Sequence, residues 1–169
     1  MTEPIVSSQW LLENLNNPDI IILDASQRKI TSDNEIKNDL KIDGARYFDL
    51  KNNFSDSGCD LPNTLLNKAQ FELESQKLGI NASSVIVVYD NLGIYSSPRV
   101  WWMFKTMGHQ NVFVLNGGLP NWIENDYPTE EIKAQQYESG NFKAHLNSES
   151  IKDFKKKIDG QVLKLALMS

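Results

Sequence analysis

Residues 85–118, VIVVYDNLGIYSSPRVWWMFKTMGHQNVFVLNGG, contain two short apolar runs on either side of a helical segment. The first run, Val85–Tyr89, is apolar at every position, which is typical of a strand buried on both faces of a parallel sheet. The second run, Val112–Leu115, has the same character. Tight connections in the order strand, helix, strand indicate parallel strands, because the helix carries the chain back to the same end of the sheet.

The segment between the two runs has the start and stop signals of a helix. We expect Ser97 to cap it, with Pro98 at the first helical position, where the missing N–H costs nothing. Gly108 ends the helix. One wide apolar stripe lies along it, at the spacing of a helix packed on a sheet, and consists of Val100, Trp101, Phe104 and Met107.

Similar signals precede this stretch. Ile20–Leu23 predicts another strand that is buried on both faces. Asn67 predicts the cap of a helix, with Gln70 in the capping-box position and Gly79 as the stop. The alternation of helices and buried strands predicts an α/β three-layer domain over residues 5–128, with a central parallel sheet and helices on both faces.

Composition excludes several classes of protein. The chain has 169 residues and a formal net charge of −5, so it has no basic excess for a nucleic-acid surface. A single cysteine excludes an internal disulfide framework and a multi-cysteine zinc site, and we expect no metal and no cofactor. No apolar run approaches the ~18 residues of a membrane span. The first residues do not resemble a signal peptide, so we expect a cytoplasmic protein without membrane contact.

The loop after the central strand is the candidate site. Ligand sites in parallel α/β sheets lie outside the carboxyl ends of the strands. Backbone N–H groups at the start of the following helix favour an anion such as a thiolate, a phosphate or a persulfide. An ordinary connecting loop is the alternative interpretation. The loop consists of Asp90, Asn91, Leu92, Gly93, Ile94, Tyr95 and Ser96.

Several motifs resemble the N-terminal domain of two-domain rhodaneses, a family that includes thiosulfate and 3-mercaptopyruvate sulfurtransferases. The most specific part is PRVWWMF at 98–104 with VLNGG at 114–118 and Trp122 after it. Residues 23–26 and 44–46 fit the same pattern. The resemblance implies a rhodanese fold and sulfur transfer through a cysteine persulfide, between a small sulfur donor and a thiol or cyanide acceptor.

The resemblance also implies that this chain by itself is inactive. In the family, the nucleophilic cysteine lies in the second domain, and Asp90 occupies the equivalent position here. Asp56 matches the position of an auxiliary aspartate, although a solvated loop carboxylate is the alternative interpretation. Asn63 stands where the family has a histidine, and an amide cannot shuttle a proton. Cys59 lies between acidic neighbours that would raise a thiol pKa, and we interpret it as an incidental surface cysteine.

The C-terminal part is predicted to differ from the domain. Residues 129–146 are polar and predict a linker or an extended wrap. Residues 147–169 repeat the order of the N-terminus, a serine-capped helix followed by an apolar run, and predict the start of a truncated second rhodanese-like domain. Docking of this tail on the first domain is the alternative. Val162–Met168 would be exposed without a second domain, so we expect it to favour aggregation or a homodimer.

Two functions therefore remain open. The chain is the non-catalytic half of a rhodanese-family sulfurtransferase, or it is a catalytically silent rhodanese-like module that binds or scaffolds a partner. A cysteine-based phosphatase is excluded, because no Cys-x5-Arg motif exists in the sequence.

Overall fold

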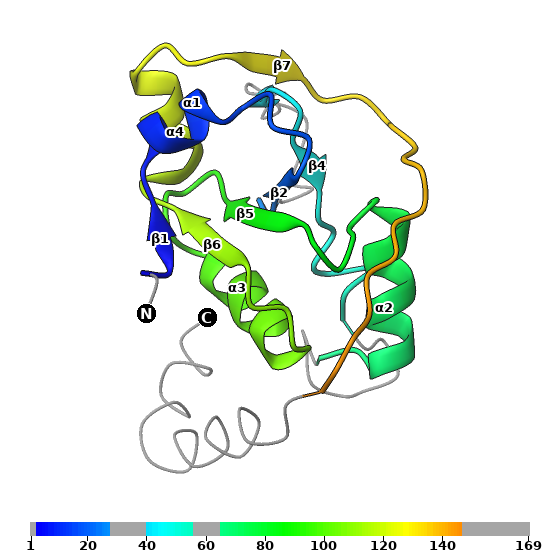
Figure 1. The fold of residues 1–169 in the computed structure, drawn as a ribbon. Helices are drawn as coiled ribbons and strands as arrows, with labels where there is room; N and C mark the ends of the chain where they lie inside the picture. The colour runs from blue at the N-terminus through cyan, green and yellow to red at the C-terminus, as the bar shows by residue number, and fades with distance from the viewer. Residues whose placement is uncertain (1–2, 28–39, 56–64, 147–169) are drawn as a thin grey trace, which may run out of the picture.

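A five-stranded parallel sheet forms the centre of the computed structural model, which describes residues 3–27, 40–55 and 65–146 (Figure 1). The strand order is β1-β6-β5-β2-β4, and every pairing in this sheet is parallel. The predicted α/β fold class is therefore confirmed. The strands are β1 (Ile5–Val6), β2 (Ile20–Asp24), β4 (Arg46–Tyr47), β5 (Val85–Tyr89) and β6 (Val112–Leu115).

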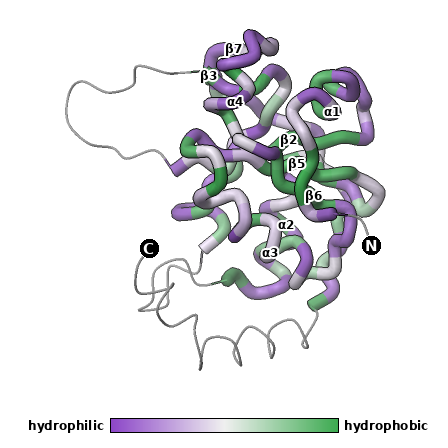
Figure 2. The backbone as a smooth tube through the Cα atoms, turned by 90° about the vertical axis from the view of Figure 1, so that its left-hand side faces the viewer, coloured by the Kyte–Doolittle hydropathy of each residue, from purple (hydrophilic) through white to green (hydrophobic). Residues whose placement is uncertain are grey.

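Strand β5 lies in the middle of the sheet and is buried on both faces. Ile86 and Val88 point into one hydrophobic core, and Val87 and Tyr89 point into the other. This alternation follows from the two-residue repeat of a strand. Figure 2 shows the hydrophobic backbone of β2, β5 and β6 running through the interior. The continuous apolarity of the sequence at β5 thus has the predicted cause, a strand with no solvent-facing side.

Within the described ranges, four helices cover the two faces of the sheet (Figure 1). On one face, α1 (Ser8–Glu13) contacts α4 (Gly118–Glu124), and the buried Trp122 of α4 anchors the core there. On the other face lie α2 (Lys68–Lys77) and α3 (Ser97–Thr106). Their aromatic residues Phe71 and Phe104 meet edge to face, with ring centroids 5.1 Å apart. Each face therefore has a core of its own.

The helix starts confirm one predicted cap and correct another. The Asn67 side chain accepts a hydrogen bond from the N–H of Gln70 at 2.9 Å, as the capping-box position predicts. The prediction that Ser97 caps α3 is wrong, because the helix begins at Ser97 and Ser96 holds the cap position without a side-chain cap bond. The physical reason is that the carboxylate of Asp90 already accepts the N–H groups of both serines.

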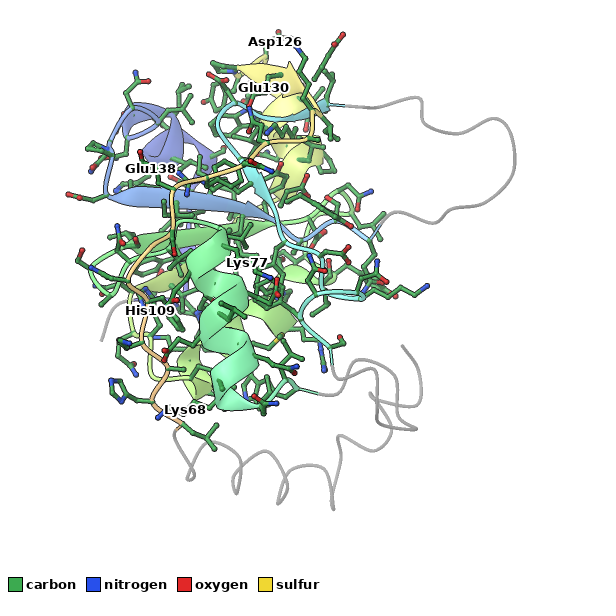
Figure 3. The ribbon with its side chains drawn as sticks, turned by 90° about the vertical axis from the view of Figure 1, so that its right-hand side faces the viewer. Lys68, Lys77, His109, Asp126, Glu130 and Glu138 are labelled. Carbon is green, nitrogen blue, oxygen red and sulfur yellow. The ribbon has the colours of Figure 1, made fainter. Side chains whose placement is uncertain are left out.

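Residues 132–146, which we call the strap, run along the outside of the domain. Before the strap, β7 (Thr129–Glu131) pairs antiparallel with β3 (Leu40–Ile42), a two-stranded sheet that the sequence did not predict. The strap then passes α2 toward its first residue, as Figure 3 shows. Phe142 of the strap is fully buried in the same core as Phe71. The polar segment is thus packed on the domain.

Some predicted features lie outside the described residues, namely Asp56, Cys59, Asn63 and the tail 147–169. Among the described helices, none is long and apolar enough to cross a membrane.

Candidate functional site

Asp90 follows β5 directly, and its carboxylate is the centre of the candidate loop. The residue is only 1% exposed. Its Oδ1 accepts a hydrogen bond from the N–H of Leu92 at 2.9 Å. Its Oδ2 accepts from the N–H groups of Tyr95, Ser96 and Ser97 at 2.8, 3.1 and 3.0 Å. The Ser97 hydroxyl also donates to Oδ2, at 2.7 Å. The loop is therefore a cradle of N–H donors around one anionic side chain.

The donors decide the charge of this carboxylate. Burial would raise the pKa of Asp90, because it disfavours the charged form. The hydrogen bonds from Ser97, Tyr95 and Leu92 outweigh burial and hold the pKa of Asp90 below its ordinary value. Asp90 is consequently an anion at neutral pH, and it occupies the place that the sequence predicted for a thiolate, phosphate or persulfide.

The start of α4 fixes the shape of the loop. Gly118 has a φ of +55°, and a Cβ at this position would lie 2.5 Å from the carbonyl oxygen of Asp90 and 2.6 Å from that of Gly93. The N–H of Leu119 donates to the Asp90 carbonyl at 3.0 Å. On the other side of the loop, the Ser96 hydroxyl donates to the carbonyl of Ala25 at 2.6 Å. The loop is held from both sides by neighbouring elements.

The outer side of the loop carries apolar side chains. Leu92, Ile94 and Tyr95 are 66%, 50% and 56% exposed, and Asn91 beside them is also exposed. A loop fixed from within thus presents three hydrophobic side chains to solvent. Such a cluster on a rigid support is typical of a contact surface.

The described residues supply no nucleophile for this cradle. The described ranges contain no cysteine. The Ser97 hydroxyl donates its proton to a carboxylate that is held anionic, and no described histidine is bonded to that serine. Nothing in the described part of the loop activates a serine for attack. The arrangement can therefore bind and hold charge, but these residues do not form a catalytic pair.

His109 is buried away from the loop. Its Nε2 lies 2.8 Å from the carbonyl oxygen of Ser84, and its ring packs against Phe104 and Phe142. Burial lowers the pKa of His109. Its surroundings are those of a neutral core histidine. Within the described ranges, no group of three or more His, Cys, Asp and Glu side chains is placed to hold a metal ion.

The sequence predicts the loop but not two residues outside it that fix its shape. The pattern predicts Ser97 as a helix cap, whereas its hydroxyl and its N–H both bind Asp90. Gly118 was not connected with the loop, although the carbonyls of Asp90 and Gly93 leave no room there for a side chain. An acidic residue directly after a central strand, followed by serines at a helix start, is a signal that could have indicated the first.

A protein-family model described as the rhodanese-like domain matches residues 7–125. Thiosulfate/3-mercaptopyruvate sulfurtransferase 1, mitochondrial, of Arabidopsis thaliana is 42% identical over 135 residues, which cover 76% of this chain and 35% of that protein. The 3-mercaptopyruvate sulfurtransferase of Escherichia coli K12 is 34% identical over 152 residues, or 86% of this chain and 53% of that protein.

Among solved structures, that of SseA from Escherichia coli, described as a 3-mercaptopyruvate sulfotransferase, superposes with a TM-score of 0.79 at 31% identity. The match covers 95% of this chain and 63% of that structure's chain. The chain thus spans about one third to one half of the length of the curated relatives that it matches.

Proposed function

The chain belongs to the rhodanese-like domain family, and from this premise we propose that it is the non-catalytic half of a thiosulfate or 3-mercaptopyruvate sulfurtransferase. In this proposal a second rhodanese-like domain carries the cysteine whose thiolate attacks the transferable sulfur of the donor. The bond from that sulfur to the rest of the donor breaks, which leaves a cysteine persulfide and releases sulfite from thiosulfate or pyruvate from 3-mercaptopyruvate. The persulfide then passes its outer sulfur to a thiol or to cyanide. The present chain supports that domain and does not transfer sulfur alone.

The observation that carries the proposal is the carboxylate of Asp90 inside the cradle. Sulfur transfer needs a thiolate, since the thiolate is the nucleophile and the persulfide is its product. A cradle of backbone N–H donors stabilises such an anion. Here the donors are used by a carboxylate that cannot accept a sulfur atom, which favours a supporting role for this loop.

An assay of the wild-type chain tests the proposal. With thiosulfate and cyanide, or with 3-mercaptopyruvate and a thiol, we expect no thiocyanate or sulfide above the rate without protein. Turnover that disappears in Cys59→Ser would contradict the proposal, because it would assign the activity to the thiol of this chain.

A gain-of-function variant tests the cradle itself. In a Cys59→Ser background, Asp90→Cys places a thiol among the same donors, and we expect its pKa to fall below the ordinary value of about 8.5. The thiolate should then attack the outer sulfur of thiosulfate and release sulfite, which adds one sulfur atom to the protein as a persulfide, measured by intact mass. Asp90→Ser in the same background is the matched control. No sulfur uptake by a folded Asp90→Cys variant would show that the loop is not a cradle for a sulfur anion.

The second candidate function is a catalytically silent module that binds a partner protein. The exposed apolar side chains of Leu92, Ile94 and Tyr95 favour it. One measurement distinguishes the two functions, made on a protein in which this chain is joined to a catalytic rhodanese-like domain. If the chain supports catalysis, Tyr95→Ser should lower the kcat of sulfur transfer by that protein. If the chain is a separate binding module, Tyr95→Ser should leave kcat unchanged.

A further inference from the structure

A cleft of about 710 Å³ lies between the strap, the end of α2 and the β4 edge of the sheet. Its volume is within the range of small-molecule sites. Asp24 and Tyr47, the last residues of β2 and β4, line it on one side, and Lys77 and Leu78 at the end of α2 line it on another, so it lies along the β4 edge of the sheet. Apolar and aromatic side chains line part of it, among them Phe54, Leu78, Ile132 and Tyr137, and polar side chains line the rest.

Residues 132–139 of the strap, which we call the arch, cross this cleft between two firm anchors. At one end, β7 pairs with β3, and Glu130 accepts hydrogen bonds from the N–H of Gly44 at 3.0 Å and from the buried Lys41. At the other end, the N–H of Gly140 donates to Gln76 at 2.8 Å, and the strap enters the core. Backbone hydrogen bonds form part of both anchors.

The arch itself is held by side chains. No backbone group of residues 132–139 forms a hydrogen bond with another described residue. Its contacts with the rest of the domain include the Tyr137 ring, which lies 4.4 Å from the guanidinium carbon of Arg46, and the Gln135 side chain, which accepts from Lys41 at 3.4 Å. The carbonyl of Glu138 also lies beside Gly79. A segment with few backbone bonds opens more easily than the elements beside it.

Arg46 is well placed to hold the arch closed. One face of its guanidinium carries the Tyr137 ring, and its Nη1 donates to the carbonyl of Leu78 at the end of α2. The negative end of the helix dipole favours a cation there. Gly79 leaves room for this contact, since a Cβ at that position would lie 2.4 Å from Nη1. Arg46 is therefore held in place by the end of α2, and the Tyr137 ring is the partner that can move away from the stack.

The charges around the cleft limit what can enter it. Lys41 pairs with Glu130 at 3.2 Å, and Lys77 pairs with Glu74 at 2.9 Å. The other two charged lining residues, Asp24 and Lys133, have opposite signs. Charge is thus nearly balanced, which favours a ligand with little net charge.

We propose that the arch is a lid over a binding cleft for a small, mainly apolar molecule of low net charge, and that the Tyr137–Arg46 stack is its latch. The inference goes beyond sulfur transfer, because it concerns neither the Asp90 loop nor a sulfur anion. The lid opens when the stack breaks, while both anchors stay in place.

Limited proteolysis with trypsin tests the latch, because Lys133 lies within the arch. Tyr137→Ala removes the ring and should speed cleavage after Lys133 about two- to fivefold, the effect of losing one cation–π contact. Tyr137→Phe keeps the ring and is the matched control, with a cleavage rate close to that of the wild type. Cleavage after Lys143, beyond the second anchor, should be unchanged in both variants, which also shows that the domain is folded. Equal cleavage after Lys133 in the two variants would overturn the latch.

Binding of the neutral fluorescent probe N-phenyl-1-naphthylamine tests the cleft. The wild type should bind it, and Ile132→Glu, which adds a charge to the lining, should weaken binding at least about tenfold. Leu92→Glu changes the exposed loop instead and should keep the wild-type affinity. Tyr137→Ala should raise the association rate by the factor seen in proteolysis. No binding by the wild type, or equal affinities of the two glutamate variants, would overturn the binding cleft.

Discussion

At the scale of single residues, Asp90 takes over two tasks that are usually separate. It satisfies the N–H groups at the start of α3, as a helix cap does, and it supplies the anion that the loop is built to hold. An amide of the same shape could not do both. Its oxygen could accept the donors on one side of the carboxylate, but its NH2 group would face the donors on the other side, and it would supply no anion.

Asp90→Asn should therefore destabilise the domain strongly. We expect the free energy of unfolding to fall by about 2–4 kcal/mol, because several charge-assisted bonds are lost in a buried place. Urea denaturation measures the change. Asp43→Asn, at an exposed position, is the control and should change stability by less than about 0.5 kcal/mol. Equal stabilities of the two variants would mean that the cradle does not depend on charge.

His109 should make stability depend on pH in a separate range. Because burial lowers its pKa, the folded chain keeps the ring neutral where the unfolded chain, with a pKa of about 6.5, begins to protonate it. The unfolded state then binds more protons, so the free energy of unfolding should fall as the pH drops from 7 to 5. The lowered pKa of Asp90 acts only below about pH 4.

His109→Gln provides the comparison, since its amide can still donate to Ser84. The variant should lose less stability than the wild type between pH 7 and 5, measured by urea denaturation at each pH. Parallel curves for the two proteins would assign the pH dependence to other groups.

At the scale of elements, the sequence predicted what local pattern determines. The runs at β2, β5 and β6 and the helices α2 and α3 are visible because burial and caps act over neighbouring residues. The strands β1, β3 and β7 are two or three residues long, and their partners lie about 90–110 positions away in the chain, as in the pairs Ile5–Val114 and Leu40–Glu131. Such pairings leave no local pattern.

The candidate site was predictable to a similar extent. The position of the loop could be predicted from the order of strand and helix, which local pattern determines. That the Asp90 side chain would take up the N–H donors of the loop could not be predicted, because its hydrogen bonds to N–H groups up to seven residues away depend on the path of the loop. The packing of Gly118 against that loop depends on a second connection of the sheet.

The strap shows that a polar element can hold an essential core residue. Phe142 is fully buried against Phe71, Phe104 and His109. We expect Phe142→Ala to lower the free energy of unfolding by about 3–5 kcal/mol, because it leaves a cavity. Leu146→Ala, at a residue that is 49% exposed, should change little. Urea denaturation of the pair measures the difference, and similar small effects would show that the strap is only loosely attached.

At the scale of the whole molecule, two truncations should separate the domain from its tail. A chain ending at Leu146 keeps every described contact, so its Tm should stay within about 5 °C of that of the full chain, with better solubility. A chain ending at Pro128 lacks β7 and Phe142, and its Tm should fall by about 10 °C or more. Scanning calorimetry measures both. A Pro128 truncation with an unchanged Tm would place the strap outside the folding unit.

The strand order has a consequence for the newly made chain on the ribosome. Among the described strands, β1 pairs only with β6, so Ile5 waits for Val114 to be synthesised before it has this partner. The core beneath α2 waits longer, until Phe142 has left the exit tunnel. Domains generally fold as units during translation. This one reaches its native state only after nearly all of the described sequence has emerged, and until then its nascent N-terminal strand is exposed to chaperones and to other chains.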